Sequence, residues 1–378
     1  MEKDILAFIK NQFDGEDFIP LHSPIFRGNE KKYLEECIDS TYVSSIGSFV
    51  DKFEKLMDDI TQTNSTTAVV NGTAALQVGL KLVGVKENDE VITQALTFVA
   101  TANSISYNNA HPIFLDVDYD TMGLSPKAVS DFLDEFGELR DDGCYNKVSG
   151  RRISACLPMH TFGFPVHLDK LIKVCNIWEI PIVEDAAESL GSLYRGMPTG
   201  SFGEVGAFSF NGNKIVTAGG GGAITTKNTF LGDRAKFLTT TAKEPHKYEF
   251  IHNEIGYNYR MPNINAALAC AQIEQLPPFL ESKRNLANDY RNFFAEKGIK
   301  FRTEAKGTRA NYWLMCIEIE NKTDYKKFLK VTNDSNVMTR PVWELMSKLP
   351  MYSHCQKDGQ KNATRLKNRI INVPSGVR

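Results

Sequence analysis

Residues 207–222 read AFSFNGNKIVTAGGGG: an apolar run, a polar loop that carries Lys214, and four consecutive glycines. The apolar run is short and bounded by turn-forming residues, which is typical of a buried strand. A glycine run lets the backbone approach a ligand closely. A lone lysine is ordinarily a solvated surface charge, but this position makes Lys214 a candidate site residue. The glycines match neither a Walker loop nor G-x-G-x-x-G, so a nucleotide-binding fingerprint is not indicated.

A carboxylate precedes this stretch at the end of another apolar run. In residues 180–189, IPIVEDAAES, Asp185 follows a wholly apolar approach and is expected at the carboxyl end of a strand, partly desolvated. A carboxylate in that position needs a cation or a hydrogen-bond donor. A metal, a protonated ring nitrogen and a simple helix-capping role are the three alternatives.

A third stretch, residues 69–76, VVNGTAAL, runs from a strand through Asn-Gly-Thr into an alanine-rich helix. The free N–H groups that begin a helix, with the Thr73 hydroxyl, form an anion site that suits a phosphate. Gly72 permits the tight turn. An ordinary strand–turn–helix junction with a threonine cap is the alternative.

The order of elements around these stretches predicts the fold class. Helical spacing occurs at 73–83, 100–107, 126–136 and 168–178, and Ser125-Pro126 is a plausible helix start. Seven short apolar or β-branched runs predict strands, at 67–70, 90–93, 112–117, 153–158, 181–184, 205–210 and 222–225. Strands that alternate with helices predict an α/β fold with a mostly parallel sheet covered on both faces, and ligands at the carboxyl ends of the strands.

The pattern changes after residue 227. Helices are predicted at 263–275, 279–297 and 323–333, with strands at 312–320 and 370–373. We therefore expect a large α/β domain with an N-terminal arm over residues 1–255 and a small C-terminal α+β domain over residues 256–378. The loop 239–257 has no clear period and is long enough to be functional or mobile.

Composition excludes several function classes. Among 378 residues, 44 Lys and Arg against 46 Asp and Glu give a net charge of −2, so no overall field favours nucleic acid or an anionic membrane. Seven scattered cysteines without a C-x-x-C pair indicate reduced thiols rather than disulfides or a zinc site. The N-terminal residues do not resemble a signal peptide, and no apolar run is long enough to span a bilayer. A soluble, cytoplasmic protein is expected.

The three stretches together fit one cofactor, pyridoxal 5'-phosphate. It needs a lysine, a carboxylate for the ring nitrogen, an anion cradle and usually an aromatic side chain against the ring. The chain offers Lys214 and Asp185 for the first two, and Gly72, Thr73, Ser209 and Phe98 for the cradle and the ring. A core aromatic is the alternative for Phe98. No metal is expected.

These motifs carry a family resemblance. NGTAAL, TFVATAN, EDAAES and SFNGNK followed by GGGG resemble the DegT/DnrJ/StrS-type sugar aminotransferases, which have the aspartate aminotransferase fold, type I of the pyridoxal-phosphate-dependent transferases. The resemblance extends from IPLHSPIFRGNE through SSIGSFVDKFE to RPVWELMSKLPMY and the terminal NVPSG. It implies an enzyme that moves the amino group of L-glutamate to a keto group of a nucleotide-linked sugar.

The resemblance also implies roles for single residues. Lys214 looks like the Schiff-base lysine, Asp185 like the partner of the pyridine nitrogen, and Phe98 like the ring-stacking residue. Glu188 lies at a position near the cofactor's phenolic oxygen, and Gly72, Thr73 and Ser209 match phosphate ligands. Asn258, in GYNYRM, is similar to an asparagine that reaches the phosphate across a dimer interface, which implies a homodimer with shared active sites.

The same family motifs indicate a substrate and leave several alternative functions open. Lysine in SFNGNK argues against the family's dehydratases. That motif with EDAAES resembles the branch acting on UDP-4-keto-6-deoxy-N-acetylhexosamines, of the legionaminic acid and bacillosamine type, so UDP-4-keto-6-deoxy-N-acetylglucosamine is the expected acceptor. The alternatives are a 3-aminotransferase on a dTDP-ketosugar, another reaction on the cofactor, and a noncatalytic homologue with a binding or regulatory role. Arg260 and Arg340 are candidates for carboxylate or diphosphate recognition, and His160 is expected to be structural.

Overall fold

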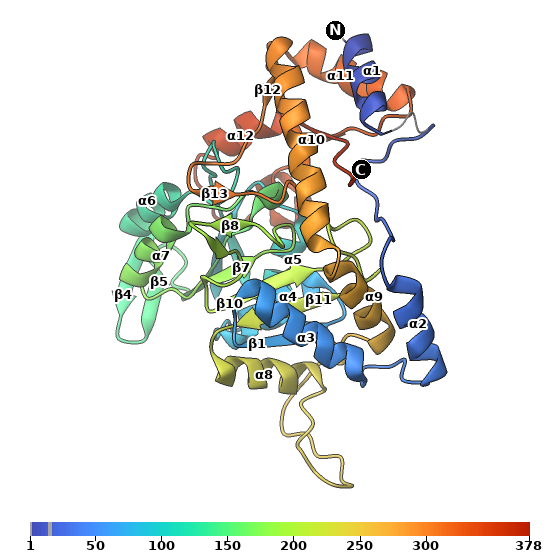
Figure 1. Cartoon of the computed structure of the whole chain (residues 1–378). Helices are drawn as coiled ribbons and strands as arrows, with labels where there is room; N and C mark the ends of the chain where they lie inside the picture. The colour runs from blue at the N-terminus through green and yellow to red at the C-terminus, as the bar shows by residue number, and fades with distance from the viewer. Residues whose placement is uncertain (1, 14–16) are drawn as a thin grey trace.

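Seven strands form the central sheet of the computed structural model, which describes residues 2–13 and 17–378 (Figure 1). Met1 and residues 14–16 of the predicted large domain lie outside the described residues. The order across the sheet is β1-β11-β10-β7 followed by β6-β2-β3, and parallel bridges join β7 to β6. All seven predicted strands are confirmed. Their bounds are β1 Ser65–Val69, β2 Glu90–Gln94, β3 His111–Leu115, β6 Ile153–Leu157, β7 Val183–Asp185, β10 Val205–Ser209 and β11 Gly222–Thr226.

The strand directions explain where the site forms. β10 pairs with β7, and β2 pairs with β3 and β6, in parallel, whereas β11 is antiparallel to both β1 and β10. The chain therefore reaches one edge of the sheet at the ends of β1, β2, β7 and β10 and at the start of β11. Gly72, Phe98, Asp185, Ser209 and Gly222 follow, end or begin these strands, so they are brought to the same edge.

Helices cover both faces of the sheet, as the sequence predicts. Val91 belongs to an apolar cluster with α4 (Gly72–Leu82), α5 (Val99–Ser106) and α8 (Thr229–Thr239). Its neighbour Ile92 belongs to another cluster with α6 (Pro126–Phe136) and α7 (Leu168–Ile177). Consecutive residues of a strand point to opposite faces, so these two clusters lie on the two sides. Ser125 caps α6 as predicted, because its hydroxyl accepts the Ala128 N–H.

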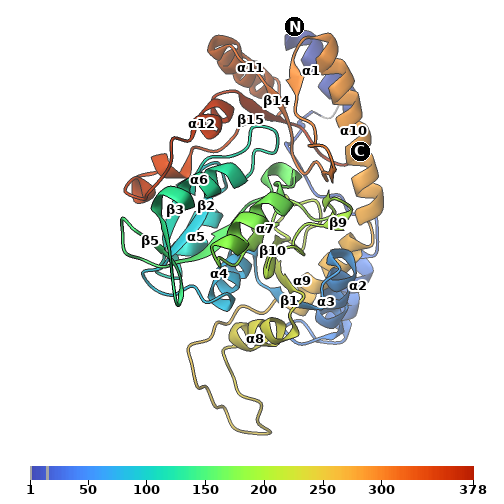
Figure 2. The same cartoon turned by 90° about the vertical axis from the view of Figure 1, so that its left-hand side faces the viewer.

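The C-terminal part contains a second, antiparallel sheet. Its order is β12 (Lys300–Phe301), β14 (Met315–Glu318), β16 (Ile370–Val373) and β15 (Arg340–Pro341). Helices α10 (Leu276–Glu296), α11 (Lys322–Asp334) and α12 (Lys361–Lys367) accompany it, which gives the expected α+β arrangement (Figure 2). The helix α9 (Asn263–Ile273) lies instead beside α2 (Glu30–Asp39) and α3 (Ser48–Thr61). The domain boundary at residue 255 stays a prediction.

The remaining elements are α1 Glu2–Gln12, β4 Gly137–Arg140, β5 Gly143–Asn146, β8 Leu193–Tyr194, β9 Met197–Pro198, β13 Thr308–Arg309 and the short 3₁₀ turns Thr161–Gly163, Met346–Lys348 and Pro350–Tyr352.

The loop after α8 projects from the body of the molecule (Figures 1 and 2). It carries exposed apolar side chains, with Tyr248, Phe250 and Ile255 between 76% and 81% exposed. None of the helices in the described part of the chain combines the length and apolar character that a membrane crossing requires.

Gly222 is one position where the central sheet leaves no room for a side chain. A Cβ added there would lie 2.4 Å from the backbone carbonyl of Asn71 and 2.8 Å from the Gly72 nitrogen. We expect Gly222→Ala to lower the free energy of unfolding by about 1–3 kcal/mol, because the turn after β1 must shift. Urea unfolding measures this change. Gly359→Ala is the control, since nothing lies within 4 Å of a Cβ there; equal unfolding midpoints for both variants would contradict the steric argument.

Candidate active site

A cavity of about 430 Å³ lies at the edge of the central sheet where the strand ends meet. The turn after β1, the end of β7, the loop between β10 and β11, and the C-terminal sheet all contribute to its wall. Seven of the eight predicted site residues line it: Gly72, Thr73, Phe98, Asp185, Glu188, Ser209 and Lys214. The structure therefore brings together side chains that are far apart in the sequence.

The start of α4 forms one end of the cavity. The Asn71 side chain caps the helix by accepting the Ala74 N–H at 2.8 Å. The N–H groups of Gly72 and Thr73 have no acceptor within the described part of the chain. Such groups at a helix N-terminus attract an anion. A Cβ on Gly72 would lie 2.8 Å from the Ser209 Cβ, so only glycine lets this turn lie against Ser209. These residues could hold a phosphate.

Asp185 presents a buried carboxylate to the cavity. Its side chain is 3% exposed, the Thr101 hydroxyl donates to Oδ2 at 2.8 Å, and the Ala187 N–H donates to Oδ1 at 3.2 Å. Burial raises the pKa of Asp185, and both hydrogen bonds oppose that rise. The carboxylate is fixed in orientation and would accept a protonated ring nitrogen. Thr101 was missed from the sequence, although it follows β2 at the same sheet edge as Phe98.

Lys214 lies against a second buried carboxylate. Its Nζ is 3.6 Å from Oε1 of Glu188, and the two side chains are 13% and 2% exposed. The other Glu188 oxygen accepts the Phe162 N–H at 2.8 Å. Burial raises the pKa of Glu188 to about 7, against the opposing effect of Lys214. Glu188 can therefore hold or release a proton beside Lys214 near neutral pH.

Trp313 is a further site residue that the sequence did not reveal. Nζ of Lys214 lies 3.9 Å from the centroid of its indole ring, a cation–π contact. The indole N–H donates to the carbonyl of Asn213 at 2.8 Å, which fixes the loop that carries the lysine. Asn311 links the same region to the carbonyl of Glu188 at 2.9 Å. Trp313 lies just before β14, about a hundred residues after the Lys214 loop that follows β10, so no local sequence pattern could link the two.

Phe98 supplies an aromatic side chain at the cavity. It immediately precedes α5, is 49% exposed, and its ring centroid lies 6.1 Å from that of Trp343. An exposed ring next to Asp185 and Lys214 can cover a flat heterocycle. With the cradle, the carboxylate and the lysine in one cavity, the residues present fit pyridoxal phosphate on geometric grounds.

Three other candidate residues lie outside the cavity. Asn258 is exposed at the base of the projecting loop, where its backbone forms a bridge with Thr240. Arg260 is buried and pairs with Glu54 at 2.8 Å. His160 is buried as predicted for a structural histidine, with Nε2 3.0 Å from the Glu184 carboxylate.

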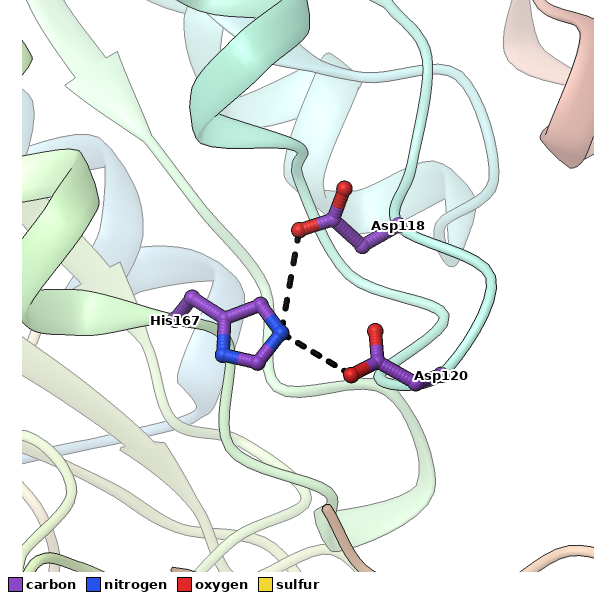
Figure 3. A group of neighbouring side chains, drawn as sticks. All are labelled: Asp118, Asp120 and His167. Carbon is purple, nitrogen blue, oxygen red and sulfur yellow. Dashed lines mark hydrogen bonds and ion pairs between the residues drawn. The ribbon is translucent and has the colours of Figure 1, made fainter. Parts of the chain in front are cut away.

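A cluster of Asp118, Asp120 and His167 is the one group in the described residues with spacing that suits a metal ion (Figure 3). His167 Nε2 lies 3.0 Å from Asp120 and 3.9 Å from Asp118. The Ser125 hydroxyl also donates to Asp118 at 2.6 Å. A hydrogen bond between His167 and Asp120 accounts for this geometry, and none of the three residues lines the cavity.

Comparisons with known proteins agree with this geometry. The model of the DegT/DnrJ/EryC1/StrS aminotransferase family matches residues 24–378. A putative pyridoxal phosphate-dependent aminotransferase, EpsN of Bacillus subtilis (strain 168), is 34% identical over 95% of this chain and 91% of its own length. The GDP-perosamine synthase of Escherichia coli O157:H7 is 35% identical over 95% of this chain and 93% of its own length. The crystal structure of DesI with its TDP-sugar product superposes with a TM-score of 0.83 at 25% identity, over 98% and 91%.

Glu188 makes stability depend on pH in the cofactor-free protein. Its pKa in the folded protein, about 7, exceeds its ordinary value, so this group's stabilising contribution is present at low pH and lost as the pH rises through 7. We expect the free energy of unfolding of Glu188→Gln, relative to that of the wild type, to increase by up to about 3 kcal/mol when the pH is raised from 5 to 8.5. Urea unfolding at both pH values measures the difference. Glu35→Gln, a change of an exposed glutamate, is the control; a gain of the same size there would contradict the assignment.

Proposed function

We propose that this chain, which belongs to the DegT/DnrJ/EryC1/StrS aminotransferase family, transfers the amino group of L-glutamate to the 4-keto group of a nucleotide-linked 6-deoxy sugar. A sugar aminotransferase that depends on pyridoxal phosphate and acts on nucleotide sugars follows from the family and its relatives. This excludes the noncatalytic homologue considered from the sequence. The donor, the ring position and the nucleotide are the proposed part. The observation that carries the proposal is Lys214, which is 13% exposed and lies 3.6 Å from Glu188 in the cavity that Asp185 also lines.

Each site residue has a distinct role in this proposal. Bound pyridoxal phosphate supplies an electron sink for the charge that develops at the donor's α-carbon. Gly72, Thr73 and Ser209 hold its phosphate, and the Asp185 carboxylate keeps the ring nitrogen protonated. Lys214 would hold the cofactor through Nζ, and its free amine would move the proton at the donor's α-carbon. The Glu188 carboxyl group, 3.6 Å from Nζ, would help to position the lysine.

Two nucleotide sugars are candidates for the acceptor. The motifs SFNGNK and EDAAES support UDP-4-keto-6-deoxy-N-acetylglucosamine. A GDP-linked ketosugar is the second candidate, because relatives in Escherichia coli and Vibrio cholerae at 35% and 31% identity are named GDP-perosamine synthase. DesI, whose structure was analysed in the presence of its TDP-sugar product, keeps a dTDP-linked ketosugar, including 3-amination, as a third alternative.

We further propose a homodimer with shared active sites. Asn258 faces solvent rather than the cavity of its own chain, although it is the residue that the family resemblance assigns to the phosphate. The adjacent loop presents Tyr248, Phe250 and Ile255 to solvent, as expected for a surface that a second copy covers. The location proposed is cytoplasmic, in keeping with seven unpaired cysteines.

The function is tested by supplying L-glutamate with UDP-, GDP- or dTDP-linked 4-keto-6-deoxy sugars and measuring 2-oxoglutarate and amino sugar. We expect 2-oxoglutarate and amino sugar in equal amounts, with one of the three nucleotides strongly preferred. NMR of the product is expected to show the amino group at position 4 of the sugar. Lys214→Ala is expected to abolish turnover while the fold and cofactor affinity are largely retained, whereas exposed Lys306→Ala leaves turnover unchanged. Wild-type turnover by Lys214→Ala would overturn the lysine's role, and no product with any of the three nucleotides would overturn the proposed reaction.

Shared sites are tested by mixing two inactive subunits. Lys214→Ala lacks the lysine, and Asn258→Asp places a negative charge against the phosphate. In a mixed dimer, the site with an intact Lys214 receives Asn258 from the other subunit and is complete. We therefore expect an equal, reassociated mixture to recover about a quarter of wild-type activity, because half of the dimers are mixed and each has one complete site. If both residues act within one chain, mixing will recover nothing.

A further inference from the structure

Lys283 is a fully buried lysine that does not line the cavity. It lies on α10, the long helix that runs between α9 and β12 (Figure 1). Burial lowers the pKa of Lys283 to about 7, and no carboxylate in the described part of the chain pairs with it. Removing an ammonium group from water without a counter-charge costs free energy. The hydrogen bonds of this amine must therefore account for its position.

The amine of Lys283 joins two segments of the C-terminal part. Its Nζ donates to the carbonyl of Trp313 at 3.2 Å, just before β14, and to the carbonyl of Ser375, just after β16. A neutral amine has two N–H groups and an ammonium has three, so both bonds persist in either protonation state. The amine therefore holds two main-chain positions that lie far apart in the sequence.

Trp313 is the residue through which this contact reaches the active site. Its main-chain N–H donates to Oδ1 of Asn311 at 2.8 Å, and its indole N–H donates to the carbonyl of Asn213 at 2.8 Å. The Nζ of Lys214 lies 3.9 Å from the centroid of the indole ring. Because Lys283 holds the carbonyl, the main chain on both sides of this side chain is fixed. A shift of that main chain would move the ring that covers Lys214.

The second acceptor of Lys283 leads to another part of the cavity wall. The Ser375 N–H donates to the carbonyl of Leu21 at 2.7 Å, and Leu21 lines the cavity. The Met315 N–H donates to the Ser375 hydroxyl at 2.7 Å, which links the same residue to β14. Lys283 therefore connects the segment that contains Trp313 with the N-terminal arm at the cavity.

We propose that Lys283 is a positioning residue of the active site, which holds the Trp313 ring against Lys214 by fixing the Trp313 carbonyl. The effect on catalysis rests on the proposed function, whereas the position of the ring does not. Lys283 acts on the reaction only through Trp313, because it contacts neither the cavity nor Lys214.

A proton relay is the alternative role for a buried lysine in this region. Burial, and after it the positive charges of Lys283 and Lys214, lower the pKa of His22, so these three side chains lie in one region. Both ring nitrogens of His22 are buried without a hydrogen-bond partner among the described residues, and Lys283 donates to main-chain carbonyls. These bonds give Lys283 no hydrogen-bonded path to Lys214 within the described residues.

The first test measures amide hydrogen exchange in the cofactor-free protein. Lys283→Met removes the N–H donors and keeps an apolar side chain of similar length. We expect the amides of residues 210–218, the loop that carries Lys214, to exchange about tenfold faster, as for the loss of one hydrogen bond. The amides of β2, in the other half of the central sheet, are expected to keep their rates. Arg291→Met, at an exposed position of the same helix, is the matched control and is expected to change neither set.

The second test measures the donor half-reaction of the holoenzyme, in which L-glutamate gives 2-oxoglutarate without any sugar. We expect Lys283→Met to lower the maximal rate about tenfold and to change the half-saturating glutamate concentration less than about threefold, because Lys283 does not line the cavity. Trp313→Phe removes the indole N–H and is expected to lower the maximal rate as well. If Lys283 acts through Trp313, the double variant will be no slower than the slower single variant.

A milder variant keeps part of the contact. Lys283→Gln retains two N–H donors on a shorter stem, so its exchange and its maximal rate are expected to lie between those of the wild type and those of Lys283→Met. Retained cofactor absorbance and a cooperative unfolding transition verify that each variant is folded. Lys283→Gln takes the place of Lys283→Met in both tests if the methionine variant does not fold.

The outcomes separate the positioning role from the proposed function. No 2-oxoglutarate from the wild type would overturn L-glutamate as the donor and leave hydrogen exchange to decide the role of Lys283. Wild-type exchange in the Lys214 loop of the variant would overturn the inference. Faster exchange in β2 as well as in the loop would also overturn it, since that is a general loss of stability. Rate losses that multiply in the double variant would mean that Lys283 acts independently of Trp313, against the inference.

Discussion

The ammonium of Lys214 and the carboxylate of Glu188 lie 3.6 Å apart in a largely desolvated space, with the Asp185 carboxylate in the same cavity. Removing such charges from water costs several kcal/mol for each ion, so the surrounding chain must supply hydrogen bonds. Thr101, Ala187 and the Phe162 backbone do this for the carboxylates, and the Trp313 ring covers the lysine. The architecture around the cavity can be understood as the set of groups that makes this arrangement stable.

Residues of the C-terminal part of the chain help to position Lys214 and Glu188. The Trp313 indole fixes the carbonyl next to Lys214, and Asn311 donates to the carbonyls of Glu188 and Leu190. The same region supplies Arg340 and Asn372 to the cavity wall. The two sheets therefore meet at the site, and the lysine is positioned by both. A change in how they pack would alter the lysine's surroundings before it altered either sheet.

The sequence predicted those features that are marked by neighbouring residues in the chain, and not those that depend on contacts between distant segments. The seven strands were predictable because each is a short apolar run. Asp185 was predictable because it ends such a run, and Lys214 because it lies in the polar loop after one. Phe98 and the cradle were found in the same way. Thr101 and Trp313 were missed because their contacts, to Asp185 and to the loop of Lys214, join segments that are distant in sequence. The β4–β5 hairpin was also missed, since its strands, GELR and GCYN, contain no apolar run.

The reversed direction of β11 has a consequence for motion at the site. Because β11 is antiparallel to β10, the lysine loop returns directly to the neighbouring strand instead of crossing over through a helix. Within the loop, the Phe210 N–H donates to Gly221 and the Ala218 N–H donates to Phe210, so both of its arms continue the pairing of two central strands. Large movements of these arms would therefore break hydrogen bonds that continue the pairing of β10 and β11. Opening of the lysine loop is in this way coupled to opening of the sheet that supports it.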